Sequence, residues 1–400
     1  MKHSTDRILT SHAGSLIRPD EIVDFEMARQ RGEAIDEEAY ERALSKAVTE
    51  VVRKQVEVGI DIVDDGEFSK SSWGTYINGR VSGFERQPGR VQPINYRGRD
   101  SERFAEYFAS PDFMAVQGMG RGPGGARATV PAMGADVCVG PITYDDRRIR
   151  QDCANLKAAA AKAGVEESFL AVVAPASAAF NAVNDYYQTE EEYVYALAEA
   201  LKQEYEAIHA AGLLVQADDA VLANAYDYLM AISRDRYRQW AELRIEALNY
   251  ALSGIPEDRV RYHLCYGSWH APHVADAPLE DIVDLILRVK AQAYSLEAAN
   301  VRHEHEWRAW ENVRLPDGKI LIPGVVTHHT LSVEHPRLVA DRIIRYAGVV
   351  GRENVIAGTD CGFAQGAFTQ RVHPTIQWAK LEALVEGARI ASTELWSNEK

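Results

Sequence analysis

The segment Tyr-His-Leu-Cys-Tyr-Gly at residues 262–267 is an apolar run that carries two metal-ligand side chains and ends in glycine. On a β-strand, side chains two residues apart point to the same face, so His263 and Cys265 are predicted to project together. An imidazole nitrogen and a thiolate sulfur are both ligands that zinc prefers. The segment therefore predicts half of a tetrahedral zinc site.

Two later segments can supply the other ligands. Glu297 closes an apolar run at 293–296, and Cys361 closes another at 355–360. If each run is a parallel strand, the carboxyl ends meet at one edge of the sheet and the side chains can converge. The carboxylate ligand stays open between Glu297 and Glu304, which belongs to the polar stretch that follows; we favour Glu297 because it ends a strand-like run.

Short apolar runs alternate with segments of helical periodicity along the chain. The segment 36–58 is an amphipathic helix, and Thr189 with Glu192 forms a capping box that opens another. This alternation is typical of parallel βα units and predicts a single α/β domain over residues 1–400, a (β/α)8 TIM barrel. Nine strand candidates compete for eight barrel positions, and 137–144 is expected to lie outside; the candidates are 7–10, 59–67, 137–144, 169–173, 213–217, 262–266, 293–297, 320–326 and 355–361.

Residues 86–136, after the second strand candidate, break this rhythm. Glycine, proline and arginine are frequent there, as in the segment 120–125, and the hydrophobic periodicity is weak. A long irregular insertion inside a compact domain is usually functional. We expect it to serve as a lid over the site or as an arm that forms a homo-oligomer.

The composition restricts the partners and the compartment. The chain has 400 residues, of which 46% are hydrophobic and 26% charged, and its net charge of −15 argues against nucleic acid or an anionic membrane as a partner. We find no apolar signal core and no membrane-spanning run. Four cysteines are too few for a disulfide framework, so a cytoplasmic protein with free thiols is predicted.

Barrel active sites lie at the carboxyl ends of the strands, and polar residues gather at those positions in this sequence. Asp218 and Asp219 follow one strand, where either can also cap the next helix. The pair at 328–329 follows another, where a loop-surface role competes with acid–base chemistry. The predicted rim also includes His12, Ser15 and Glu67.

Taken in order, these motifs resemble the catalytic half of cobalamin-independent methionine synthase and its shorter zinc-dependent thiol alkyltransferase relatives. The matching segments, which run nearly the length of the chain, are 10–15, 64–67, 215–219, 263–265, 295–297 and 360–362. The resemblance implies a zinc ion held by His263, Cys265, Glu297 and Cys361. It also implies a thiol substrate bound by the rim residues His12, Ser15, Glu67, Asp218 and Asp219, with Asp218 pairing with an ammonium group and His329 shuttling a proton.

The function predicted in this way is zinc-dependent transfer of an alkyl group, in first place methyl, to a small thiol such as homocysteine, as in methionine biosynthesis. A thiol bound to zinc ionises and becomes a nucleophile. The alkyl donor stays open, because the nearest match to the family's folate-binding Thr-Gly-Pro strand end is Val-Ala-Pro-Ala-Ser at 173–177 and no tryptophan follows closely. The alternatives are thiol addition to an epoxide, the reverse carbon–sulfur cleavage, and a noncatalytic zinc- or thiol-binding barrel.

Overall fold

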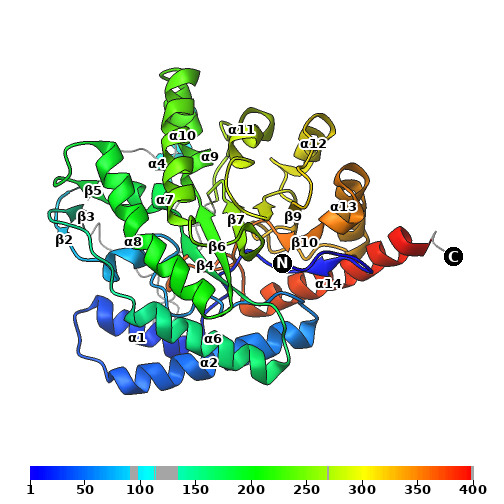
Figure 1. Cartoon of the computed structure of the whole chain (residues 1–400), viewed down its shortest axis with the longest axis horizontal. Helices are drawn as coiled ribbons and strands as arrows, with labels where there is room; N and C mark the ends of the chain where they lie inside the picture. The colour runs from blue at the N-terminus through cyan, green and yellow to red at the C-terminus, as the bar shows by residue number, and fades with distance from the viewer. Residues whose placement is uncertain (91–97, 112, 114–133, 268–269, 398–400) are drawn as a thin grey trace.

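A curled parallel β-sheet forms the centre of the molecule in a computed structural model, which describes residues 1–90, 98–111, 113, 134–267 and 270–397 (Figure 1). The sheet has seven strands in the order β1-β10-β9-β8-β7-β6-β4. Their bounds are β1 (Leu9–Thr10), β4 (Phe169–Val173), β6 (Leu214–Asp219), β7 (Val260–Leu264), β8 (Ala293–Leu296), β9 (Ile320–Val326) and β10 (Ile356–Thr359).

The segment 60–65 occupies the remaining position of the barrel, between β1 and β4. The backbone N–H of Ile62 donates to the carbonyl of Thr10 (3.1 Å), and the N–H of Phe169 donates to the carbonyl of Val63 (3.0 Å). Both edges of the sheet are therefore joined by this segment, and the α/β-barrel prediction is confirmed. The sequence predicted a regular strand here, whereas the structure has one isolated parallel bridge, between Val63 and Ser168.

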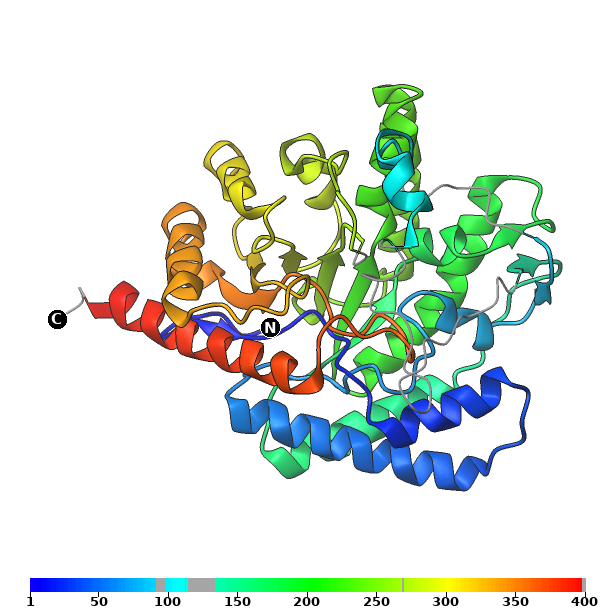
Figure 2. The same ribbon diagram turned by 180° about the vertical axis from the view of Figure 1, so that it is seen from behind.

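Helices surround the sheet on its outer side (Figures 1 and 2). The α-helices are α1 (Asp20–Gln30), α2 (Glu37–Val58), α6 (Arg147–Ala163), α7 (Pro175–Phe180), α8 (Glu190–Ala210), α9 (Val221–Met230), α10 (Arg234–Ala251), α11 (Leu279–Ile286), α12 (Ala309–Asn312), α13 (Pro336–Val350) and α14 (Pro374–Trp396). Short 3₁₀ helices are η1 (Thr75–Gly79), η3 (Glu257–Arg259), η4 (Glu304–Arg308) and η5 (Arg352–Asn354). In the described part of the chain, no helix has the length and hydropathy needed to cross a bilayer.

Local sequence explains where several helices start. Asp36 accepts a hydrogen bond from the Ala39 N–H at the start of α2, and Thr189 and Glu192 form the predicted capping box of α8. The final helix α14 runs alongside the N-terminal strand, where the Ser392 hydroxyl accepts from the Ile8 N–H (2.9 Å) (Figure 2). The two ends of the chain thus contribute to the same side of the barrel.

A second, three-stranded sheet lies outside the barrel, with the order β2-β3-β5. Its strands are β2 (Phe84–Gln87), β3 (Ala135–Cys138) and β5 (Val183–Asn184). The candidate strand at 137–144 therefore belongs outside the barrel, as predicted. Of the predicted insertion, residues 91–97, 112 and 114–133 lie outside the described residues, and short helices α3 (Asp100–Arg103) and α4 (Ala105–Ala109) lie between them. Its role as lid or arm, and the single-domain boundary, stay predictions.

The strand register brings the polar residues of the rim together. Asp218 on β6 is paired with His263 on β7, and His263 is paired with Ser295 on β8. The barrel strands β4, β7, β8, β9 and β10 are buried along their whole length, which explains their continuous apolar sequences. The polar side chains that follow these apolar runs therefore lie together at the carboxyl end of the barrel.

Candidate metal and substrate site

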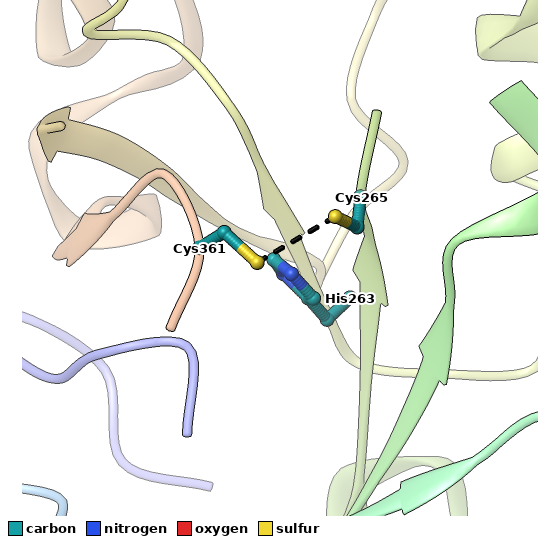
Figure 3. Close-up of side chains that lie close together, drawn as sticks. All are labelled: His263, Cys265 and Cys361. Atoms are coloured by element: carbon teal, nitrogen blue, oxygen red, sulfur yellow. Dashed lines mark hydrogen bonds between the residues drawn. The ribbon is translucent and has the colours of Figure 1, made fainter. Parts of the chain in front are cut away.

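Three predicted ligands meet at the carboxyl end of the barrel (Figure 3). His263 is on β7, Cys265 directly follows β7, and Cys361 follows β10. One ligand atom from each residue lies within 4.8 Å of the others, and the two sulfurs are 3.5 Å apart. All three residues are buried. The group is the one cluster of histidine, cysteine and acidic side chains within the described residues whose geometry suits a metal ion.

The donor set fits a zinc ion. A tetrahedral ion with zinc–sulfur bonds of about 2.3 Å places two sulfurs about 3.8 Å apart, close to the separation found here. Nδ1 of His263 is 3.0 Å from the Ser295 hydroxyl, which orients the ring. The other ring nitrogen, Nε2, is buried and has no hydrogen-bond partner in the described part of the chain. A buried nitrogen of this kind favours a metal bond.

Burial also affects the two thiols. The hydrogen bond with Cys361, together with burial, raises the pKa of Cys265 well above its ordinary value. Two buried sulfurs next to each other therefore resist ionisation. A bound divalent ion would reverse this balance, because metal coordination deprotonates thiols outright.

Glu297 lies beside this cluster. Its carboxylate accepts hydrogen bonds from the Tyr266 N–H (3.0 Å) and from Nδ2 of Asn300 (2.8 Å). Burial and the charge of Asp360 raise the pKa of Glu297 well above its ordinary value. The other candidate, Glu304, is directed to an ion pair with Nε of Arg342 (3.1 Å). Glu297 as the fourth ligand stays a prediction, and its burial next to the cysteine loop supports it over Glu304.

A cavity of about 110 Å³ opens on the cluster. Its walls include all three cluster residues and three of the predicted substrate-binding residues, Ser15, Glu67 and Asp218. These side chains come from segments far apart in the sequence. A small polar molecule in this cavity would therefore contact the sulfurs and two carboxyl groups at once.

A strained turn positions the Glu67 side chain in the cavity wall. Both Gly66 (φ 70°) and Glu67 (φ 58°) have left-handed backbone conformations, and among the described non-glycine residues Glu67 shares this property only with His273. Gly14 (φ 136°) approaches this carboxylate so closely that an added Cβ would lie 2.6 Å from Oε1 of Glu67. Backbone strain of this kind is common at functional sites.

Asp218 is the second carboxyl group of the cavity. Nε2 of Gln216 donates to its Oδ1 (2.9 Å). Burial raises the pKa of Asp218 to about 7, although His263 acts in the opposite direction. A cationic ligand group placed here would favour the ionised carboxylate. This property fits the predicted pairing with a substrate ammonium group, which stays a prediction.

Two predicted binding residues lie outside the cavity lining. His12 is buried, with Nε2 2.8 Å from Oε1 of Gln55. Oδ1 of Asp219 accepts from the N–H groups of Val221 and Leu222 at the start of α9, so its contacts are those of a helix-capping residue. Their roles in substrate binding stay predictions, and the contacts described here hold the walls of the site in place.

His329 lines a different and larger cavity of about 420 Å³, which it shares with Glu297 and His303. Its ring lies beside those of His270 and His273, with centroids 5.6 and 5.8 Å away. Burial and the neighbouring histidines lower the pKa of His329 to about 3, so its ring is neutral near pH 7. The predicted proton shuttle would therefore operate from the neighbouring cavity.

Sequence reasoning did not identify several residues of the smaller cavity. They are Trp73, Asn224, Gln365 and Arg371. Arg371 and Gln365 lie between Cys361 and the first turn of α14, a stretch without periodicity. The only sequence signal available was their position just after a predicted ligand, which points to the rim of a barrel.

A parallel α/β barrel with a buried histidine–cysteine–cysteine group at the carboxyl ends of its strands is the arrangement of a barrel enzyme whose site could hold a metal ion. Residues 113–383 match the family described as cobalamin-independent synthase, catalytic domain, and the chain belongs to this family, that of the cobalamin-independent methionine synthases. The family predicted from the motifs is therefore confirmed.

Named relatives agree over nearly the whole chain. The chain is 23% identical over 390 residues to the methionine synthase of Thermococcus kodakarensis, covering 96% of this chain and 94% of the relative. It is 23% identical over 387 residues to the methionine synthase of Pyrococcus furiosus, covering 96% and 93%. A solved B12-independent methionine synthase from a Shewanella species, in complex with selenomethionine, has the same fold, with a TM-score of 0.72 at 20% identity over 98% of this chain and 99% of that one.

Proposed function

We propose that this protein is a zinc-dependent methyltransferase that transfers a methyl group to the sulfur of homocysteine. The observation that carries the proposal is the cluster of His263, Cys265 and Cys361 opening on a small cavity that also contains Glu67 and Asp218. The relatives named methionine synthase support it, because the similarity spans almost the full length of both chains.

The protein residues would hold the metal and position the thiol. Zinc would be bound by His263, Cys265, Cys361 and Glu297. When bound, it would lower the pKa of the substrate thiol and so provide a thiolate nucleophile near pH 7.

The substrate would be oriented by the cavity walls. Glu67 and Asp218 would accept hydrogen bonds from the homocysteine ammonium group, and Ser15 would contact its backbone atoms. Holding the sulfur in line with an electrophilic carbon reduces the entropic part of the barrier. His329, from the neighbouring cavity, would exchange a proton with the reacting groups, as the family resemblance implies.

The methyl donor is proposed to be a methylated reduced folate, as in the family that the chain resembles. Residues 175–180, which form α7 at the rim, contain no tryptophan that could stack on the pterin ring. The experiment therefore has to test the donor separately from the acceptor.

Purified protein with one equivalent of zinc is incubated with homocysteine and methyltetrahydrofolate, as monoglutamate and triglutamate, and methionine is measured. A parallel reaction contains 2-mercaptoethanesulfonate and epoxypropane, and consumption of the thiol is measured. Methionine formation is the expected result. Thioether formation only in the second reaction would favour the epoxide alternative, and no consumption of any thiol by zinc-loaded protein would favour a noncatalytic barrel.

We also propose a cytoplasmic location for this reaction. Cys138 and Cys153 form no disulfide, and Cys265 and Cys361 belong to the proposed metal site. Metal-binding thiols of this kind require a reducing compartment.

A further inference from the structure

Arg371 stands out among the walls of the 110 Å³ cavity. It is the only lysine or arginine among the described residues that line it, and the other charged side chains there are Glu67 and Asp218. In a chain with a net charge of −15, a cationic side chain at the metal cluster is not explained by overall composition. The position of Arg371 therefore has to be explained by its contacts within the cavity.

The guanidinium is held in place by its own loop. Nε of Arg371 donates to Oε1 of Gln365 (2.8 Å), and Nε2 of Gln365 donates to the carbonyl of Gly362 (2.5 Å). The backbone N–H of Arg371 donates to the carbonyl of Phe363 (3.0 Å). Such bonds orient the side chain before any ligand arrives, which reduces the entropy lost on binding.

The same loop is joined to the Ser15 segment. The Phe363 N–H donates to the Ser15 carbonyl (2.8 Å), and a Cβ on Gly362 would lie 2.0 Å from Oγ of Ser15. Because Gly362 directly follows Cys361, the metal cluster, Ser15 and Arg371 are parts of one rigid wall. These hydrogen bonds therefore fix the position of Arg371 relative to the sulfurs.

The cation, the two acids and the two sulfurs line one cavity. Burial lowers the pKa of Arg371 to about 10, while the sulfurs of Cys361 and Cys265 act in the opposite direction. Arg371 is thus placed to pair with a negative charge on a ligand that occupies the same cavity as the sulfurs. A buried guanidinium is stabilised by an anion, which the ligand can provide.

We infer that Arg371 selects acceptor thiols that carry an acidic group, a carboxylate or a sulfonate, by pairing its guanidinium with that group while the thiol faces the metal cluster. This inference rests on the proposed function, because it names the class of thiol that the same site accepts. Arg371 acts as a specificity-determining residue, and the two carboxyl groups add a preference for an amine where the thiol has one.

The test compares three thiols that differ only in the group at the far end of a two-carbon chain: 3-mercaptopropionate, 2-mercaptoethanesulfonate and 2-mercaptoethanol. Their dissociation constants are measured by calorimetry with zinc-loaded wild-type protein and with Arg371→Gln, Arg371→Lys and the exposed control Arg314→Gln. The zinc content of each variant is measured first, so that metal loss is recognised. Binding of the thiol to the metal is followed independently from the absorption spectrum of the cobalt-substituted protein.

We expect the wild-type protein to bind at least one acidic thiol about tenfold more tightly than 2-mercaptoethanol, the scale of one charge-assisted hydrogen bond. Arg371→Gln should remove this preference and leave the affinity for 2-mercaptoethanol within about twofold, and Arg371→Lys should restore part of it. The acidic thiol that binds more tightly, 3-mercaptopropionate or 2-mercaptoethanesulfonate, shows whether the site prefers a carboxylate or a sulfonate. Arg314→Gln should behave as the wild type.

Equal affinities for acidic and neutral thiols in the wild type, or an equal loss of affinity for all thiols in Arg371→Gln, would overturn the inference. The second outcome would mean that Arg371 only supports the metal cluster. If no thiol changes the cobalt spectrum, the proposed function itself fails, and this result is distinct because metal–thiol contact is absent whatever the charge of the ligand.

Discussion

At the residue scale, the site depends on a few positions where the chemistry tolerates little change. Gly14 leaves room for the Glu67 carboxylate, and Glu67 itself has a backbone conformation that side chains rarely adopt. The three cluster residues are buried within 4.8 Å of each other. Single substitutions at these positions therefore report on the site more directly than on the fold.

Gly14→Ala is expected to displace the Glu67 carboxylate, because the new Cβ would lie 2.6 Å from Oε1 and the φ of 136° disfavours alanine. We expect the KM for homocysteine to rise by about tenfold or more while zinc content stays at one equivalent. Gly164→Ala, at another positive φ with open space around it, controls for backbone strain alone. An unchanged KM in Gly14→Ala would show that Glu67 does not contact the substrate.

Cys361→Ser is expected to lower zinc affinity by about tenfold or more and to abolish most of the activity, because a hydroxyl is a poor replacement for a thiolate ligand. Zinc is measured by atomic absorption after dialysis against a weak chelator. Cys153→Ala, a buried cysteine remote from the cluster, should keep full zinc content. Retention of zinc and activity in Cys361→Ser would rule out the proposed ligand set.

At the element scale, the loops after β7 and β8 are joined by a buried charge network next to the site. Nδ1 of His303 is 2.8 Å from Oε2 of Glu306, and its Nε2 is 3.1 Å from Oδ2 of Asp276. The His303 ring stacks on Tyr266, whose N–H holds Glu297. One imidazole thus links the segment after Cys265 to the first turn of η4.

Burial lowers the pKa of His303, but the hydrogen bonds with Asp276 and Glu306 outweigh it and raise the pKa to about 10. The ordinary value in an unfolded chain is about 6.5. Between these values the folded state retains a proton that the unfolded state releases, so this stabilisation is complete below about pH 6.5 and is lost as pH rises towards about 10.

The free energy of unfolding is measured by urea denaturation at several pH values across that window. In the wild type it should fall as pH rises, and in His303→Gln the slope should be much smaller because the titrating group is gone. His305→Gln, on the same short helix, is the matched control, with the slope of the wild type. Parallel slopes for the wild type and His303→Gln would contradict a protonated, ion-paired imidazole.

At the scale of the whole molecule, the barrel interior is held by a buried arginine. Arg261, on β7, donates from Nη1 to the Ser11 hydroxyl (2.8 Å) and from Nη2 to the His12 carbonyl (3.0 Å). Its guanidinium also lies 3.8 Å from the centre of the Phe169 ring on β4. One side chain therefore connects strands on different sides of the barrel.

Arg261→Ala is expected to lower the free energy of unfolding by about 3 kcal/mol or more, because it leaves a cavity and removes the partners of buried polar groups. Urea denaturation followed by circular dichroism measures the change. The exposed Arg314→Ala should change stability by less than about 0.5 kcal/mol. A similarly small effect for Arg261→Ala would mean that the barrel is held together without this interior contact.

The segment at the second barrel position shows what sequence patterns can predict about this fold and what they cannot. The run Ile60 to Val63 has the apolar character of a strand, and its place in the barrel was predicted, but the segment makes only isolated strand-like bonds. In the turn with positive φ at Gly66 and Glu67, the N–H groups of these residues donate to the carboxylates of Asp64 and Asp65, and Gly14 leaves room for the Glu67 side chain. Periodicity cannot predict such a turn, because side-chain hydrogen bonds and the close approach of Gly14 leave no periodic pattern in the sequence.

What this sequence determined alone is the alternation of strands and helices and the placing of His263 and Cys265 on one face, because both follow from short-range periodicity in the chain. The tertiary structure decided how closely Cys361 approaches them, which the resemblance had only implied, and it alone decided that His329 and Glu297 line a separate cavity and that Arg371 lines the cavity of the sulfurs. These contacts join residues far apart in the chain, and they arise only when the barrel closes and brings the carboxyl ends of its strands together.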